Sequence, residues 1–247
     1  MSENETAEGK APGKFSLGKL LPLVVLAAGF AAFFAFGLNE YVSLEQLRAN
    51  RETLQQLVVE NLALMALVYI GIYALMVAFS VPGALVATLT GGFLFGTLLG
   101  GFFTVFAATI GATIVFIAAK TALGDMLRAK AGPSLQKMEE GFRENAFSYL
   151  LVLRLVPLFP FFLVNLAPAF LGVQLRTYVA ATFVGIIPGT FVFSSVGNGL
   201  GAIFDRGDEP DLGIIFQPEV LIPILGLAVL SLVPVIYRRF SKDKATS

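Results

Sequence analysis

LRLVPLFPFFLVNLAPAF, residues 153–170, places an arginine, an asparagine and three prolines inside an otherwise apolar stretch. A water-soluble core would not accommodate Arg154 without a partner, because burying an unpaired charge is costly. A plain membrane-spanning helix is not expected to contain Pro157, Pro160 and Pro168, since proline removes a backbone donor and breaks the helix. The stretch therefore predicts a helix interrupted at membrane depth, which is tolerated only where the backbone is buried in protein or lines a wet cavity.

The composition of the whole chain indicates a polytopic membrane protein. Of the 247 residues, 56% are hydrophobic and 14% are charged, and the mean hydropathy is +0.80, which fits neither a disordered chain nor an ordinary soluble domain. Basic and acidic residues number 17 each, so the net charge does not favour nucleic acid as a partner. Cysteine and histidine are absent, and no Walker A or Gly-x-Ser-x-Gly motif occurs. We therefore expect no enzyme, no metal site and no cofactor.

Apolar runs and polar interruptions divide the chain into six segments. In chain order these are a disordered tail (1–19), an N-terminal transmembrane helix (20–38), an amphipathic surface segment (39–61), a membrane core (62–201), an extracytoplasmic loop (202–219) and a C-terminal transmembrane helix with a basic tail (220–247). The surface segment has capping-box spacing between Ser43 and Gln46; a soluble helix packed on its neighbours is the alternative. Runs within 62–81, 102–119 and 178–196 raise the number of predicted spanning helices to about five.

Two apolar segments of the core are broken by proline and glycine, at residues 82–101 and 152–171. Two arms of about eight residues reach roughly 12 Å each, less than half of a hydrocarbon core of about 30 Å. Each segment therefore predicts a re-entrant hairpin, the first one turning near Gly91 and Gly92. The residues predicted to break these and neighbouring helices are Pro82, Gly83, Gly96, Pro157, Pro160, Pro168, Pro188 and Gly189.

A loose internal repeat supports the pairing of these two segments. AATIGATIVF at 107–116 recurs as AATFVGIIPGTFVF at 180–193, each some two dozen residues after the leading proline of a broken segment. A unit of one hairpin and one span crosses the membrane once, so the second copy must be inverted relative to the first. The pattern predicts the inverted repeat that is typical of many transporters, whose sites lie near the membrane midplane.

The positive-inside rule predicts the orientation of the chain. Lysine and arginine are frequent in the connection 120–149 and after residue 237, whereas the loop 201–218 carries Arg206 alone among several acidic residues. The connection 120–149 and the C-terminus are therefore expected on the cytoplasmic side and the loop outside. The side on which the N-terminus lies is left open, because it depends on whether the segment 82–101 crosses fully.

Three stretches resemble the core of the DedA / SNARE-associated Golgi protein family, also called the VTT-domain family. They are VPGALVATLTGGFLFGTLLG (81–100), EEGFRENAFSYLLVLRLVPLFPFFLVNLAPAFLG (139–172) and GIIPGTFVFSSVGNGLG (185–201), and the resemblance covers about 65–201. It is closer to the Golgi-type Tvp branch than to the DedA branch. The resemblance implies two facing re-entrant hairpins and movement of phospholipid or polyprenyl-phosphate lipids between leaflets. DedA-branch members usually carry an acidic residue, associated with proton coupling, where this chain has Ala84.

Arg154 is the leading candidate for a substrate-binding residue. It is the only ionisable side chain with long apolar runs on both sides, and a guanidinium suits a phosphate group; the alternative is an arginine that snorkels to the interface. Asn165, Gly91 and Gly92 are further candidates for headgroup contact, and Glu139, Glu140 and Arg143 form a candidate gate. We expect a lipid flippase or scramblase in a bacterial inner (plasma) membrane, with a small-ion or metabolite transporter and a non-transporting scaffold as alternatives. A homo-oligomer is left open.

Overall fold

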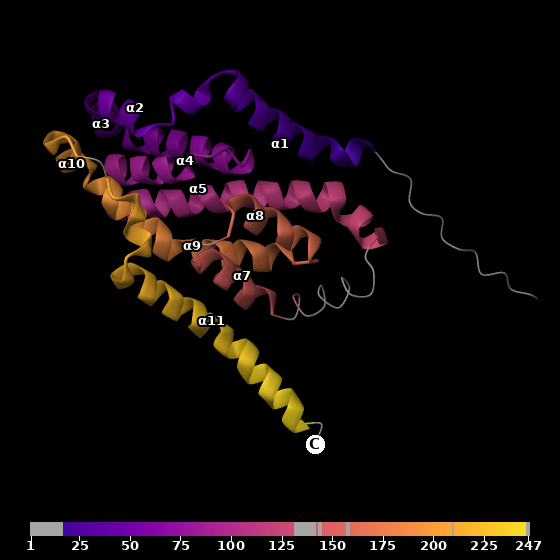
Figure 1. Ribbon diagram of the computed structural model, residues 1–247. Helices are drawn as coiled ribbons and strands as arrows, with labels where there is room; N and C mark the ends of the chain where they lie inside the picture. Colours follow the sequence, from indigo (N-terminus) through magenta and orange to yellow (C-terminus); the bar gives the residue numbers. More distant parts are fainter. Residues whose placement is uncertain (1–16, 131–141, 143–144, 157–158, 209, 246–247) are drawn as a thin grey trace, which may run out of the picture.

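The computed structural model describes residues 17–130, 142, 145–156, 159–208 and 210–245 (Figure 1). Every regular element in these ranges is a helix, and no strand occurs in them. The predicted all-α class is thereby confirmed. The predicted break at Pro157, the candidate gate residues Glu139, Glu140 and Arg143, and most of the predicted disordered tail lie outside the described residues.

A first group of helices is formed by α4 (Leu62–Ala78) and α5 (Ala84–Lys130). α5 is interrupted at Gly96, which has φ 76° and ψ 173°, a conformation that glycine adopts readily and other residues do not. The backbones of Gly91 and Gly100 are in direct contact, which is possible only if the chain reverses between them. The first arm, residues 84–95, therefore folds back on the long helix that begins at residue 97.

The observed reversal corrects the predicted position of the first turn. Gly91 and Gly92 are helical and lie within the first arm, and the turn lies at Gly96. The second arm is also not separate from the predicted span 102–119, because the helix runs without a further break to Lys130. Pro82 lies in the turn before α5, and Gly83 has φ 115°, so both mark a helix boundary as predicted.

A second group repeats the same order of elements. α7 (Ala146–Leu155) is followed in the chain by the short helix α8 (Phe161–Phe170) and the long helix α9 (Leu175–Asn198). Pro160 is the N-cap of α8, and Gly172, with φ 66°, lies in the turn before α9. Each group therefore has a helix, a connection that contains proline, a short helix, a glycine of positive φ and a long helix.

Three prolines or glycines that were predicted to break helices do not do so. Pro168 lies inside α8, and Pro188 and Gly189 lie inside α9, which is continuous from Leu175 to Asn198. The segment 152–171, predicted as the second hairpin, contains only the last turn of α7 and the whole of α8. Proline is tolerated in apolar helices where neighbouring groups compensate for the lost backbone hydrogen bond.

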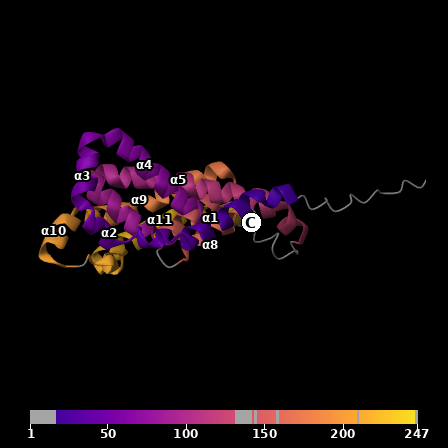
Figure 2. The ribbon, with the colours of Figure 1, turned by 90° about the horizontal axis from the view of Figure 1, so that it is seen from above.

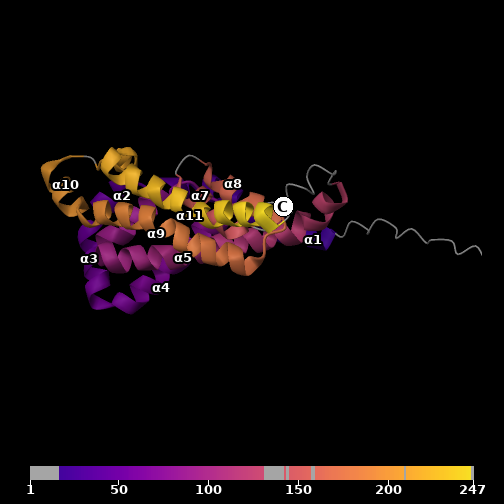
Figure 3. The same ribbon diagram turned by 90° about the horizontal axis from the view of Figure 1, so that it is seen from below.

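The two long helices pack side by side in opposite directions. The Tyr178 hydroxyl contacts the Ala112 carbonyl, a Cβ on Gly101 would touch the Phe191 ring, and the Lys120 ammonium donates to the Val173 carbonyl at 3.1 Å. Residue numbers therefore rise along α5 as they fall along α9. Figure 1 shows α4, α5 and α8–α9 as stacked layers, and the views from above and below show the elongated body that they form (Figures 2 and 3).

The remaining helices cover one end and the flanks of this body. α1 (Leu17–Ala35) lies along α5, while η1 (Leu38–Glu40), α2 (Leu44–Ala49) and α3 (Arg51–Glu60) lead to α4. α10 (Leu200–Arg206) lies at the end where α2 and α3 are found, and η2 (Leu212–Phe216) precedes α11 (Pro218–Ala245). α11 packs against α7 and then extends away from the body (Figure 1).

The amphipathic segment is helical and packs on its neighbours. Ser43 caps α2 as predicted, because its Oγ accepts a hydrogen bond from the Gln46 amide at 3.2 Å. Leu47 is buried against Leu89 and Leu200, and the Arg51 guanidinium pairs with the Asp205 carboxylate at 2.7 Å. Segment 43–60 and α10 therefore lie at the same end of the molecule, whereas a position on the membrane surface stays a prediction.

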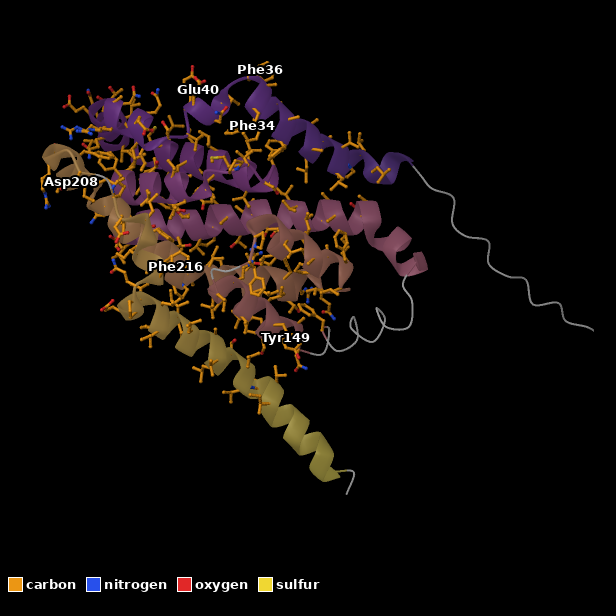
Figure 4. All side chains as sticks on the ribbon, viewed as in Figure 1. Phe34, Phe36, Glu40, Tyr149, Asp208 and Phe216 are labelled. Carbon is orange, nitrogen blue, oxygen red and sulfur yellow. The ribbon has the colours of Figure 1, made fainter. Side chains whose placement is uncertain are left out.

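Three of the described helices are long and apolar enough to cross a membrane: Ala84–Ala122, Leu175–Asn198 and Pro218–Ile236. The first of these includes the Gly96 turn, and the part after that turn is itself long enough. The apolar stretches Leu20–Ala35 and Leu62–Ala78 are shorter, so three of the five predicted spans meet the length of a full crossing. Large apolar side chains cover the outside, as Phe34, Phe36 and Phe216 illustrate (Figure 4).

Five threonine hydroxyl groups in α5 are satisfied locally. Thr88, Thr90, Thr104, Thr109 and Thr113 each donate to the carbonyl oxygen four residues earlier. This bond lets a polar side chain remain in an apolar environment without another partner. It is the arrangement expected of helices surrounded by lipid.

The ends of α9 offer a direct test of the predicted orientation. Gln174, before α9, and Asp208, after α10, are exposed at opposite ends, about 36 Å of helix apart. Because the chain lacks cysteine, Gln174→Cys and Asp208→Cys can be labelled without background by a membrane-impermeant maleimide. In intact cells we expect Asp208→Cys and Gln55→Cys, in α3, to react, and Gln174→Cys to react only after permeabilisation. If Gln174→Cys alone were labelled in intact cells, the orientation would be the opposite of the predicted one.

Candidate functional site

Arg154 lies in the last turn of α7 and reaches across to α9. Its Nη2 atom donates to the Tyr178 hydroxyl at 2.9 Å and to the Thr182 hydroxyl at 3.1 Å, and its guanidinium carbon lies 5.5 Å from the centre of the Tyr178 ring. A Cβ on Gly185 would collide with the Arg154 side chain, so this glycine leaves the space that Arg154 occupies. The arginine is thus directed into the protein and held by α9.

Tyr178 joins four helices. Its side chain is fully buried, and its ring stacks on Phe116 of α5 with a centre-to-centre distance of 4.3 Å. Its hydroxyl hydrogen is shared between Asn165 Oδ1 of α8 at 3.2 Å and the Ala112 carbonyl of α5 at 3.3 Å, while its oxygen accepts from Arg154. We call Arg154, Asn165, Tyr178 and Thr182 the arginine cluster.

Two donors of the arginine cluster have no acceptor among the described residues. They are Arg154 Nε and Asn165 Nδ2, both buried. Leaving a buried donor unpaired costs about 1–3 kcal/mol, and more for a charged group. No carboxylate pairs with Arg154 in the described part of the chain, and no group of three potential metal ligands occurs there. The cluster is therefore rich in donors and fits an oxygen-bearing anion better than a cation.

The four predicted substrate-binding residues separate into two pairs. Arg154 and Asn165 lie together, connected through Tyr178. Gly91 lies beneath the Tyr69 hydroxyl, and Gly92 lies against the Ser194 backbone. Ser194 is roughly 13 Å along α9 from Gly185, which lies beside Arg154, so the two glycines are not part of the arginine cluster.

Gly92 instead belongs to a closely packed seam between the first arm of α5 and the end of α9, whereas Gly91 packs against α4 and the second part of α5. A Cβ on Gly92 would collide with the Ser194 carbonyl oxygen, and one on Gly197 would collide with the Leu89 carbonyl oxygen. Small residues allow helix backbones to approach in this way in membrane proteins. Gly91 and Gly92, the candidates for headgroup contact, therefore lie at closely packed positions.

Sequence reasoning missed Tyr178, Thr182 and Gly185. Their spacing of four and three residues places them on one face of a helix, so the sequence could have predicted a polar face within this apolar span. The sequence could not predict which side chain this face contacts, because only the tertiary fold brings Arg154 to it.

The fold and the site together define a helical integral membrane protein with a buried cationic centre. Residues 81–199 match the VTT domain family, and the resemblance drawn from the sequence is confirmed.

The relatives of the chain include proteins named Transmembrane protein 41B or Transmembrane protein 41 homolog. The chain is 26% identical to the Transmembrane protein 41 homolog of Dictyostelium discoideum over 68% of its own length and 49% of that protein. It is 26% identical to human Transmembrane protein 41B over 71% of its length and 60% of the relative. For the Caenorhabditis elegans homolog the identity is 22%, over 70% of both chains. The chain thus spans about half to three fifths of the first two relatives, and no solved structure matches.

Proposed function

We propose that this protein moves phosphate-headgroup lipids between the two leaflets of a membrane, in the manner of a flippase or scramblase and without enzymatic chemistry. The observation that carries the proposal is the arginine cluster: a guanidinium held among apolar helices, with unpaired donors on both Arg154 and Asn165. A phosphate group has several acceptor oxygens and a negative charge, so it would complement both donors and the cation.

The arrangement of helices supports the same proposal. We infer that α5, with its Gly96 turn, and the pair α7–α8 are re-entrant hairpins, and that the two helix groups form an inverted repeat in the membrane. This inference rests on the shared order of elements and on the opposite directions of α5 and α9. In transporters, sites built at the contact of inverted repeats replace bulk water with protein dipoles and half-helix ends. Such a site would lower the barrier for a polar headgroup while the acyl chains stay in the bilayer.

Reconstitution into liposomes tests the proposed activity. Vesicles containing the protein and a trace of phospholipid with a fluorescent headgroup are treated with an impermeant reductant, which bleaches only outer-leaflet label. We expect the wild-type protein to expose the inner-leaflet label as well, whereas empty vesicles keep it protected. A soluble dye enclosed in the same vesicles checks that they do not leak. Protection equal to that of empty vesicles, in vesicles shown to contain folded protein, would reject lipid movement and favour an ion or metabolite carrier or a scaffold.

A further inference from the structure

A concave site separate from the arginine cluster lies between the amphipathic segment and the first group of helices. It is a groove of about 370 Å³ whose walls come from residues 41–54, from α4 and from the first arm of α5. This volume lies within the usual range of small-molecule sites. None of its lining residues belongs to the arginine cluster.

The interior of the groove offers little to a polar ligand. The Tyr69 hydroxyl is engaged by Thr104 at 2.6 Å and by the Ala87 carbonyl at 3.0 Å, and the Tyr73 hydroxyl lies 2.9 Å from Thr88. Thr90 donates to the Val86 carbonyl. These three hydroxyl groups therefore already have partners, and much of the remaining wall is hydrocarbon, including Leu47, Leu54 and Met65.

The walls of the groove differ in character. On the side of α4, the lining residues Val68 and Ile72 are 44% and 56% exposed and continue the apolar outer face formed by Leu64, Leu67 and Leu75. The amphipathic segment contributes Ser43, Gln46 and Asn50, which are polar and uncharged. This segment is joined to α10 by the Arg51–Asp205 ion pair. The groove therefore has an apolar wall that continues into the outer face of α4 and another wall that contains polar side chains.

We propose that this groove holds one acyl chain of a membrane phospholipid, whose headgroup lies beside Gln46 and Asn50. The proposal commits to a phospholipid because an apolar wall that continues into the outer face of α4, together with a wall that carries polar side chains, matches the two parts of that molecule. A free fatty acid would place a carboxylate in a groove that no basic side chain lines. The site goes beyond the proposed movement of lipids and does not require it.

Tryptophan fluorescence tests the occupant, because the natural chain has no tryptophan. Leu54 and Gln55 are neighbours in α3, but Leu54 lines the groove and is half-buried whereas Gln55 is exposed and does not. Leu54→Trp and Gln55→Trp proteins are reconstituted in phosphatidylcholine with or without bromine atoms in the middle of its acyl chains. We expect Leu54→Trp to lose most of its fluorescence in the brominated lipid and Gln55→Trp to lose little. Equal quenching of the two variants, or no quenching of Leu54→Trp, would overturn the proposal. If the fluorescence of an unquenched Leu54→Trp changed when the protein was diluted, a second copy of the chain would be the occupant of the groove, which also overturns the proposal.

A second measurement uses the unaltered chain and so does not depend on how the variants fold. Wild-type protein is irradiated in vesicles that contain phosphatidylcholine with a photoreactive group near the end of one acyl chain. Crosslinks to Leu47, which is only 4% exposed, or to Leu54 are expected. Crosslinks confined to the outer face of α4, such as at Leu64 and Leu67, would contradict the proposal. An Arg154→Ala variant should give the same crosslinks in the groove. The test of acyl-chain binding in the groove is therefore independent of the test of lipid movement at the arginine cluster.

Discussion

Replacing Arg154 by alanine is expected to reduce lipid movement by about tenfold to a hundredfold or more. The variant removes the only positive charge of the arginine cluster and the bonds to Tyr178 and Thr182. A hydrogen bond to a charged group contributes about 1.5–3 kcal/mol, and each 1.4 kcal/mol is about tenfold in an equilibrium. The initial rate of headgroup exposure in the liposome assay, at matched protein density, measures the effect.

Two further variants separate charge from geometry. Arg154→Lys should restore part of the rate, because an ammonium keeps the charge but lacks the planar, two-armed geometry of the guanidinium. Arg176→Ala is the matched control, since Arg176 is an exposed arginine in the first turn of α9 and outside the cluster; it should behave as the wild type. A folded Arg154→Ala protein that moves lipid at the wild-type rate would show that the arginine only anchors α7.

Gly92→Ala is expected to destabilise the protein, although alanine is normally the better residue in a helix. In an open helix the exchange stabilises by about 0.5–1 kcal/mol. At position 92 the new methyl group would collide with the Ser194 carbonyl oxygen, and a backbone atom cannot move aside as a flexible side chain can. Overpacking of this kind costs about 1–3 kcal/mol, so the first arm of α5 should separate from α9. Thermal unfolding in detergent, followed by circular dichroism, should show a lower midpoint and a loss of lipid movement.

Gly71→Ala is the matched control for this seam. Gly71 lies in the middle of α4, and a Cβ there would meet no atom within 4 Å. Its melting temperature should equal or slightly exceed that of the wild type. If Gly92→Ala were as stable as Gly71→Ala, the close approach of α5 and α9 would not contribute to stability.

Local properties of the chain were sufficient to predict much of the architecture. Long apolar runs predicted helices close to those observed, because burial of apolar surface in lipid and internal backbone hydrogen bonding both require them. The Ser43 cap was predictable because it depends on residues only three positions apart. Pro82 and Pro160 mark boundaries for a similarly local reason, since proline restricts its own backbone and the residue before it. Arg154 stood out because a charge between apolar runs needs a partner.

The tertiary structure decided which of several equivalent residues takes each role. Any of five glycines in residues 91–101 was able to form the first turn, and Gly96 does so; three of the others lie where backbones touch, Gly91 with Gly100 and Gly92 with Ser194. Pro168 and Pro188 lie inside helices, which the general rule that proline breaks a helix did not predict. Arg154 and Asn165 meet only because the chain reverses at Gly172 and brings Tyr178 between them. These conformations are nearly equal in local energy, so the packing between distant segments determines which one forms. The local sequence alone therefore cannot predict it.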